Sequence, residues 1–190
     1  LPEIELTLSK LSQHVQLIEQ TELALNYWET NIIPKRNKSK YHKASYLVKL
    51  MTAYNEKDEA KLENTKEPKE DFIEVRGFKS NHYKSFFKAL IRFDTDPESA
   101  YQIFNSLYHQ FKESASVCIN RFASKINWAT KTNSDALFNE ALEEWLIVEN
   151  HLNSTLIASI QDSVWINKLT VYFHLKDIES FEKLYVELPL

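Results

Sequence analysis

Residues 94–111 read DTDPESAYQIFNSLYHQF, and this stretch combines the signals of a helix start with those of a buried helix face. Asp96 is suited to cap a helix, and Pro97 is suited to its first position, where an N–H is not needed. Apolar side chains then recur at helical spacing. They are Ala100, Ile103, Phe104, Leu107 and Phe111. The stretch therefore predicts an amphipathic helix that begins at Pro97 and packs one face into a core.

The same kind of pattern extends over most of the chain. Short polar breaks at 132–135 and 176–177 separate further apolar stripes, so six helices joined by short connections are predicted between residue 80 and the end. The last of these helices carries Ile178, Phe181, Leu184 and Tyr185. Upstream, residues 3–32 predict one long amphipathic helix, which Pro34 ends. A second helix is predicted from about 42 to 55, with a buried face of Ala44, Leu47, Val48 and Met51.

The glycine count points to the same fold class. Gly77 is the only glycine in 190 residues. The turns of sheet proteins and the loops that cradle phosphates draw on several glycines, so sheet folds, P-loops and dinucleotide-binding folds are excluded. We predict an all-α fold of antiparallel helical hairpins, with about eight helices. Two arrangements remain open, a right-handed α-solenoid and an irregular helical bundle.

Charge marks a change of organisation in the first half of the chain. The stretch 56–71 holds seven acidic residues against four lysines and is poor in apolar side chains, which is typical of a solvated helix end or a linker. We therefore expect residues 1–55 to form the long helix and a short basic helix. Residues 56–79 would form a charged connector, and residues 80–190 a repeat-like region, within one continuous helical domain.

The stretches 97–107, 134–142 and 177–184 carry similar core signatures at a spacing of about forty residues, in the range of helix-hairpin repeats. The positions that match are Ala100, Phe104, Leu107, Phe181, Leu184 and Pro189. On these residues, 80–190 resembles repeats of the tetratricopeptide or pentatricopeptide kind. The resemblance implies a short stack of hairpins with a concave face for a protein or peptide. A pentatricopeptide-like stack would instead imply binding to single-stranded RNA.

The basic stretch 35–49 holds the single candidate for catalysis. Arg36 and His42 are six positions apart, with a polar residue next to the arginine. This pair resembles the active motif of HEPN-type RNases. The resemblance implies that Arg36 and His42 act together on the RNA 2′-hydroxyl and the scissile phosphate. A solvated basic connector accounts for the same residues without any chemistry, and it is the preferred interpretation.

The same stretch is also the candidate binding patch. Its cations could contact phosphates and its tyrosine rings could stack on bases, so RNA or an acidic partner is the alternative to a solvated segment. The acidic stretch that follows at 56–71 would neutralise part of this charge. The candidate binding residues are Lys35, Arg36, Lys38, Lys40, Tyr41 and Lys43.

No sequence pattern points to a metal, a cofactor or a covalent nucleophile. The six histidines are scattered, and a single cysteine leaves neither a disulfide nor a Cys-based zinc site. We expect Cys118 to be a small buried hydrophobe. Glu143 and Glu144 are expected to be solvated, because neighbours in sequence do not share a helix face.

The first functional hypothesis is a non-catalytic α-helical interaction module, or scaffold, that binds a protein or peptide partner. Trp128, Trp145 and Trp165 stand at helical apolar positions of 80–190, where they would pack in the core or line a groove for an apolar peptide. The alternatives are an RNA-related role and a helical subdomain of a larger enzyme. Helix 3–32 is a candidate for pairing two copies as a homodimer.

Charge, the length of the uncharged runs and the ends of the sequence suggest where the protein acts. The formal net charge is −4, which gives no general attraction to nucleic acid. The longest uncharged runs are shorter than the roughly 20 residues of a spanning helix, so we predict no membrane insertion. Without targeting signals or disulfides, an intracellular, cytoplasmic location is expected. The first residue, Leu1, and the apolar end 188–190 lead us to expect a piece of a longer protein.

Overall fold

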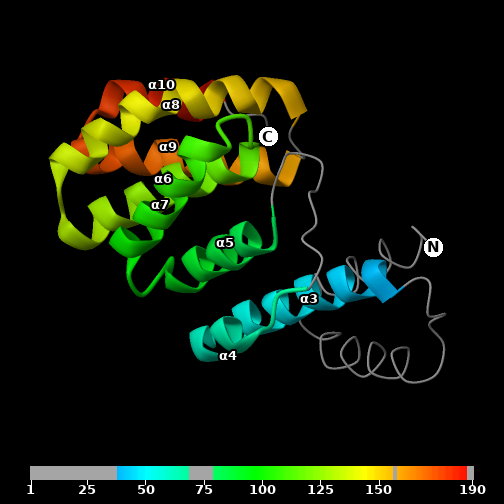
Figure 1. Ribbon diagram of the computed structural model, residues 1–190. Helices are drawn as coiled ribbons and strands as arrows, with labels where there is room; N and C mark the ends of the chain where they lie inside the picture. Colours follow the sequence, from blue (N-terminus) through cyan, green and yellow to red (C-terminus); the bar gives the residue numbers. More distant parts are fainter. Residues whose placement is uncertain (1–37, 69–78, 156–157, 188–190) are drawn as a thin grey trace. The chain divides into compact units, whose positions relative to one another are not determined.

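The computed structural model describes residues 38–68, 79–155 and 158–187, and all the regular structure in these ranges is α-helical (Figure 1). The prediction of an all-α fold is therefore confirmed. The predicted helix 3–32 and the stretch around Gly77 lie outside the described residues. The helices are α3 (Lys38–Asn55), α4 (Glu59–Asn64), α5 (Ser80–Arg92), α6 (Pro97–Gln110), α7 (Ala115–Thr132), α8 (Asp135–Thr155), α9 (Ala158–Leu175) and α10 (Ile178–Glu187).

The chain divides into two compact units, Leu1–Ile91 and Arg92–Leu190. Helices α3 to α5 belong to the first unit, and α6 to α10 belong to the second. The sequence pattern instead groups α5 with the helices that follow and treats 56–79 as a connector. In the structure, α4 forms within that charged stretch, and Ile91 of α5 packs into the same cluster as Leu62 of α4.

A small apolar cluster holds the first unit together. Tyr46, Leu50 and Ala53 of α3 pack against Leu62 of α4 and Ile91 of α5. The three α3 side chains are four and three positions apart, which places them on one side of the helix. Ion pairs add to the packing. Lys88 Nζ on α5 lies 2.6 Å from the Glu63 carboxylate and 3.3 Å from the Glu59 carboxylate, both on α4.

The buried side of α3 is rotated from the predicted one. Val48 is buried as expected, but Leu47 and Met51 are only half-buried, whereas Tyr46, Leu50 and Ala53, which were not predicted, are buried. A tyrosine can occupy this core position because its hydroxyl donates to the Ser80 carbonyl at 2.9 Å. The side chain of the fourth predicted residue, Ala44, lies outside the described ones.

Three helix junctions use the same two-residue pattern, a left-handed residue followed by the cap of the next helix. At the end of α9, Lys176 has a φ of 57°. Its N–H donates to Phe173, and the N–H of Asp177 donates to Tyr172 at 3.0 Å. The Asp177 carboxylate then accepts from the Ser180 N–H at 3.1 Å. The three junctions are Lys57-Asp58, Asn133-Ser134 and Lys176-Asp177.

These junctions show how a chain with one glycine can be built from short-linked helices. Left-handed helix ends are usually made by glycine, and lysine or asparagine takes that place here. The predicted start of α6 is confirmed as well. Pro97 is its first residue, and the Asp96 carboxylate accepts from the Ser99 N–H at 3.2 Å.

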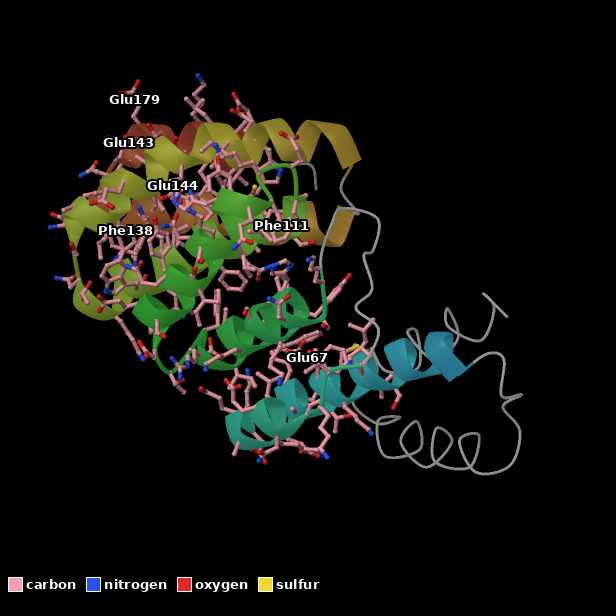
Figure 2. All side chains as sticks on the ribbon, viewed as in Figure 1. Glu67, Phe111, Phe138, Glu143, Glu144 and Glu179 are labelled. Carbon is pink, nitrogen blue, oxygen red and sulfur yellow. The ribbon has the colours of Figure 1, made fainter. Side chains whose placement is uncertain are left out.

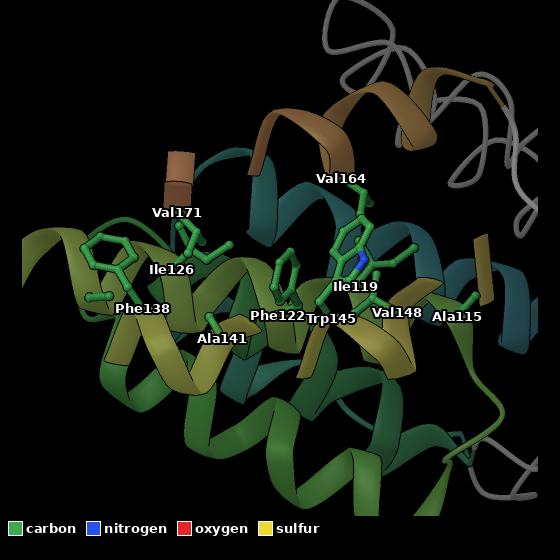
Figure 3. Packing of buried hydrophobic residues seen from close by; sticks show 11 residues of the cluster. Ala115, Ile119, Phe122, Ile126, Phe138, Ala141, Trp145, Val148, Val164 and Val171 are labelled. Atoms are coloured by element: carbon green, nitrogen blue, oxygen red, sulfur yellow. The ribbon is translucent and has the colours of Figure 1, made fainter. Parts of the chain in front are cut away.

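Helix α7 is the central helix of the second unit, since it packs on α6, α8 and α9. Its apolar side meets α8 and α9 in one core, in which the side chains point toward one another (Figure 3). Phe122 and Trp145 lie at the middle of this core, with ring centroids 5.7 Å apart. The buried residues of the core are Ala115, Ile119, Phe122, Ile126, Ala129, Phe138, Ala141, Trp145, Val148, Val164 and Val171.

Candidate functional site

Glu144 is a buried acid on α8, and its burial contradicts the prediction that both neighbouring glutamates are solvated. Glu143 is exposed, whereas Glu144 is only 8% exposed. Figure 2 labels both residues, with Glu143 at the edge of the second unit and Glu144 among packed side chains. Glu144 follows the buried Ala141 by three positions and precedes the buried Val148 by four, so it shares their side of the helix. Helical spacing around the apolar stripe could have separated the two acids.

The carboxylate of Glu144 collects donors from two other helices. Its Oε1 atom lies 2.7 Å from Lys125 Nζ and 2.8 Å from Arg121 Nη2, both on α7. The Tyr101 hydroxyl on α6 donates to the same oxygen at 2.9 Å. Lys125 Nζ also lies 2.9 Å from Glu140 Oε2, one helical turn earlier on α8. These five residues, Tyr101, Arg121, Lys125, Glu140 and Glu144, form what we call the ionic cluster.

Aromatic rings and an amide enclose the cations of the ionic cluster. The Arg121 guanidinium lies 4.5 Å from the centroid of the Tyr108 ring, and its Nε donates to Asn105 Oδ1 at 3.0 Å. Lys125 Nζ lies 4.7 Å from the centroid of the Tyr101 ring. Both cations are therefore held by charge, by hydrogen bonds and by ring faces at once. The cluster connects α6, α7 and α8.

Lys125 keeps its proton in this environment. Burial lowers the pKa of Lys125, but the hydrogen bonds with Glu144 and Glu140 raise it by more, and the net pKa is above the ordinary value of a lysine. A depressed pKa is what activates a lysine as a base or a nucleophile near neutral pH, and Lys125 shows the opposite shift. The ionic cluster therefore does not supply an activated amine.

The cluster also leaves one polar atom unsatisfied. Within the part of the chain that the structure describes, Glu144 Oε2 is buried and has no hydrogen-bond partner. The same holds for Nε1 of the neighbouring Trp145, which is not part of the cluster. Burying charges is costly, and a pair of this kind adds little net stability compared with apolar packing. We infer that the ionic cluster mainly selects how α6, α7 and α8 pair, since any other register would leave its charges buried without partners.

The predicted catalytic pair is not tested by the structure. Lys35 and Arg36 lie outside the described residues. Lys38, Lys40, Tyr41, His42 and Lys43 belong to α3, which starts before the predicted position, but their side chains are not among those described. The pairing of Arg36 with His42 and the basic binding patch therefore stay predictions.

Cys118 is a buried side chain, as predicted. It is 3% exposed, and burial raises the pKa of its thiol to about 11. Its Sγ donates to the Lys112 carbonyl at 3.4 Å. In the described ranges, no group of three or more His, Cys, Asp or Glu side chains is placed to hold a metal ion.

The second candidate site is an exposed apolar surface on α9 and α10. Helix α9 is apolar on opposite sides. Val164 and Val171 point into the core, while Ile166 and Phe173, two residues further along, are 59% and 69% exposed. Two residues correspond to about 200° of rotation, so the exposed pair lies opposite the buried pair.

Helix α10 leaves apolar residues exposed in the same way. Ile178 and Tyr185, which the sequence pattern assigns to one stripe with the buried Leu184, are 68% and 64% exposed. We call the set Ile166, Phe173, Ile178, Tyr185 and Val186 the hairpin surface. Phe173 and Ile178 stand on either side of the junction between the two helices.

The tryptophans of the second unit each lie against another aromatic ring. Trp145 is 4% exposed, and its ring centroid lies 5.1 Å from that of Trp165. Trp128 lies 5.9 Å from the Tyr101 ring by the same measure. Core packing, the first of the two hypotheses, therefore accounts for Trp145, whereas Trp128 and Trp165 are half-buried.

No known family model matches this sequence, and no curated protein or solved structure is detectably similar to it. In the described residues, none of the helices has both the length and the apolar character needed to cross a membrane.

Proposed function

We propose that this chain is a non-catalytic helical interaction module that binds a protein partner through the hairpin surface. The observation that carries the proposal is the exposure of Phe173, at 69%, on the side of α9 opposite its core residues. Single exposed apolar residues are common on proteins. Five of them on two consecutive helices form a set, and such sets typically mark interaction sites.

The ionic cluster supports a non-catalytic role for the second unit. Its lysine remains protonated, and Glu144 Oε1 already receives three donors from Tyr101, Arg121 and Lys125. Charged groups that are engaged with one another in this way hold helices in register. The surface that remains available for a partner is therefore better sought on α9 and α10.

The order in which the helices pack also supports a repeat-like scaffold. Each helix from α6 to α10 packs on the next, and α7 packs in addition on α9. Contact between a helix and its second neighbour is what a stack of hairpins requires. We infer that α6 to α10 form such a stack, of the tetratricopeptide-like kind suggested by Ala100, Phe104 and Leu107.

Comparative capture from a native lysate tests the proposed function. The full chain is used as bait beside two variants, Phe173→Asp on the hairpin surface and Gln102→Asp on α6. Both replaced residues are exposed, so each variant adds one carboxylate at the surface and should keep the unfolding transition of the wild type. A protein retained by the wild type and by Gln102→Asp, but lost with Phe173→Asp, is the expected result.

Two results would contradict the proposal. Partners that bind Phe173→Asp as well as the wild type would show that the hairpin surface is not the binding site. Partners that all disappear after RNase treatment would favour the RNA-related alternative and would direct attention to the basic stretch 35–49.

A further inference from the structure

The unit that carries the hairpin surface is acidic. The second unit, Arg92–Leu190, contains fourteen Asp or Glu against eight Lys or Arg, which is a formal charge of −6, and its residues 158–187, which include α9 and α10, account for −2 of it. The excess of acid in the chain therefore lies in the second unit. This surface differs in charge from the basic stretch 35–49.

Acidic side chains alternate with the exposed apolar ones on α10. Glu182 stands four positions after Ile178 and four before Val186, so it lies between them along one row of the helix. Glu179 lies one turn before Glu182, and both are exposed. Neither glutamate forms an ion pair with the part of the chain that the structure describes. Figure 2 shows Glu179 projecting from the outside of the second unit.

The lysine of α9, Lys168, is half-buried and lies over an aromatic ring. Lys168 Nζ lies 4.2 Å from the centroid of the Trp145 ring. Burial lowers the pKa of Lys168, although Glu149 and Glu187 partly oppose this effect. Among the described residues of 135–187, the exposed cations are Lys176 and Lys183. The exposed surface therefore combines apolar anchors with two glutamates, Glu179 and Glu182, that are not held in ion pairs within the described residues.

Resting on the proposed function, we propose that the partner is a basic amphipathic helix, with apolar residues on one side and lysine or arginine beside them. Apolar anchors would pack on Phe173, Ile178 and Tyr185, and the flanking cations would face Glu179 and Glu182. An apolar helix face laid on an apolar surface is a common mode of peptide recognition. Complementary charge at the rim adds specificity and speeds association.

Other occupants have the wrong charge for this surface. Nucleic acid and anionic membranes would be repelled by it. The amphipathic stretch 3–32 of this chain carries five glutamates against one lysine, so it lacks the flanking cations. A second copy that presented the same hairpin surface would bring acid against acid.

Fluorescence anisotropy of two labelled peptides with the full chain tests the inference. The first is a synthetic amphipathic helix of about 18 residues, five turns long, with leucine on one side and lysine and arginine on the other. The second is the acidic peptide 3–32 of this sequence. The basic peptide is expected to bind at least about tenfold more tightly, and its affinity should fall with added salt.

Variants locate the site and separate the two contributions. Phe173→Asp should weaken binding of the basic peptide by about tenfold or more, because it removes an anchor. The double variant Glu179→Gln with Glu182→Gln should weaken it by roughly fivefold and should flatten its salt dependence. Glu98→Gln with Glu113→Gln removes two exposed acids elsewhere in the second unit and should change little.

The outcomes distinguish this inference from the proposed function. If both peptides bind equally and Phe173→Asp weakens both, the hairpin surface stands and the basic partner is wrong. If the basic peptide binds Phe173→Asp unchanged, charge alone holds it elsewhere, and the proposed surface fails too. If the chain self-associates without any peptide and Phe173→Asp abolishes that association, the occupant of the hairpin surface is a second copy of the chain and not a basic helix. If the basic peptide does not bind at all, the inference is wrong. The proposed function is then tested by the lysate experiment alone.

Discussion

Lys125 of α7 and Glu144 of α8 meet with their charged atoms 2.7 Å apart, and their side chains are only 5% and 10% exposed. The pair lies beside the apolar core built by Phe122 and Trp145 of the same two helices. Opposite charges buried at such a distance constrain both helices, because sliding either one would separate the pair while keeping it out of water. The second unit is therefore held by packing and also by a requirement for one register.

Glu144→Gln is expected to destabilise the protein by about 3 kcal/mol, because Lys125 and Arg121 would lose the carboxylate that compensates their charge. Urea unfolding followed by circular dichroism measures the change. Glu143→Gln is the matched control, since the neighbouring acid is exposed and its replacement should alter stability by less than about 0.5 kcal/mol. Equal effects of the two changes would show that Glu144 is not buried as described.

The coupling within the ionic cluster can be measured by a double-mutant cycle. Lys125→Met should cost about 2 kcal/mol by itself, less than Glu144→Gln, because Arg121 still pairs with Glu144. The double variant should be more stable than the sum of the single losses by about 1–2 kcal/mol. Strict additivity would mean that the two side chains do not interact in solution.

Alkaline pH should weaken the contribution of Lys125 to stability. Its pKa in the folded protein is above the ordinary value of about 10.4, owing to Glu144 and Glu140. Below that pH the lysine is protonated in both states, and its contribution is complete. As pH rises further, the unfolded chain releases the proton while the folded chain keeps it, so unfolding becomes more favourable.

The stability difference between the wild type and Lys125→Met should therefore shrink above about pH 10.4, by up to about 1.4 kcal/mol per pH unit. Urea unfolding of both proteins between about pH 9 and 11.5 tests this, because other titrating groups cancel in the difference. A difference that grows with pH would reverse the assigned direction of the pKa shift.

Lys176→Gly should stabilise the protein by about 1 kcal/mol. Lys176 has a φ of 57°, a conformation that costs residues with a Cβ atom free energy and that glycine adopts without cost. Lys183→Gly is the control, because it places glycine inside α10 and should destabilise by about 1 kcal/mol. Thermal unfolding of the two variants should shift in opposite directions, and a loss of stability in both would contradict the left-handed junction.

Cys118 should react very slowly with thiol reagents in the folded protein at pH 8. It is buried, and burial raises the pKa of the thiol to about 11, so little thiolate forms. Labelling with a chromogenic disulfide reagent should be fast in urea, where the chain is unfolded. Fast labelling without urea would indicate that the start of α7 opens readily.

Phe104→Ala should destabilise the protein by about 3–5 kcal/mol, because the side chain is fully buried on α6 and its loss leaves a cavity. Phe173→Ala on the hairpin surface should change stability by less than about 0.5 kcal/mol. Urea melts of the two variants compare a core phenylalanine with an exposed one. A large loss for Phe173→Ala would show that this residue is packed in the folded chain.

Much of the fold could be predicted from local sequence signals. The start of α6 follows from Asp96 and Pro97, because capping and proline geometry depend on the few residues around a helix end. The break at Lys176-Asp177 was predictable for the same reason, although the left-handed lysine was not. Burial of Cys118 followed from its place in an apolar helical stretch.

The candidate sites were less accessible to such reasoning. Helical spacing could have placed Glu144 beside the apolar stripe, but Tyr101 and Arg121, which make its burial possible, come from other helices. The spacing likewise groups Ile178 and Tyr185 with Leu184. Only the packing shows that Leu184 is buried and that Ile178 and Tyr185 are exposed.

The sequence by itself determined that this protein is all-helical and where several helices begin and end, because capping, turns and periodicity act over a few residues. Tertiary structure decided which acid is buried, which apolar side chains remain exposed, and that α5 packs with α3 and α4. These outcomes depend on the partner that each helix face finds. That partner lies far away in sequence, and local free energies do not specify it.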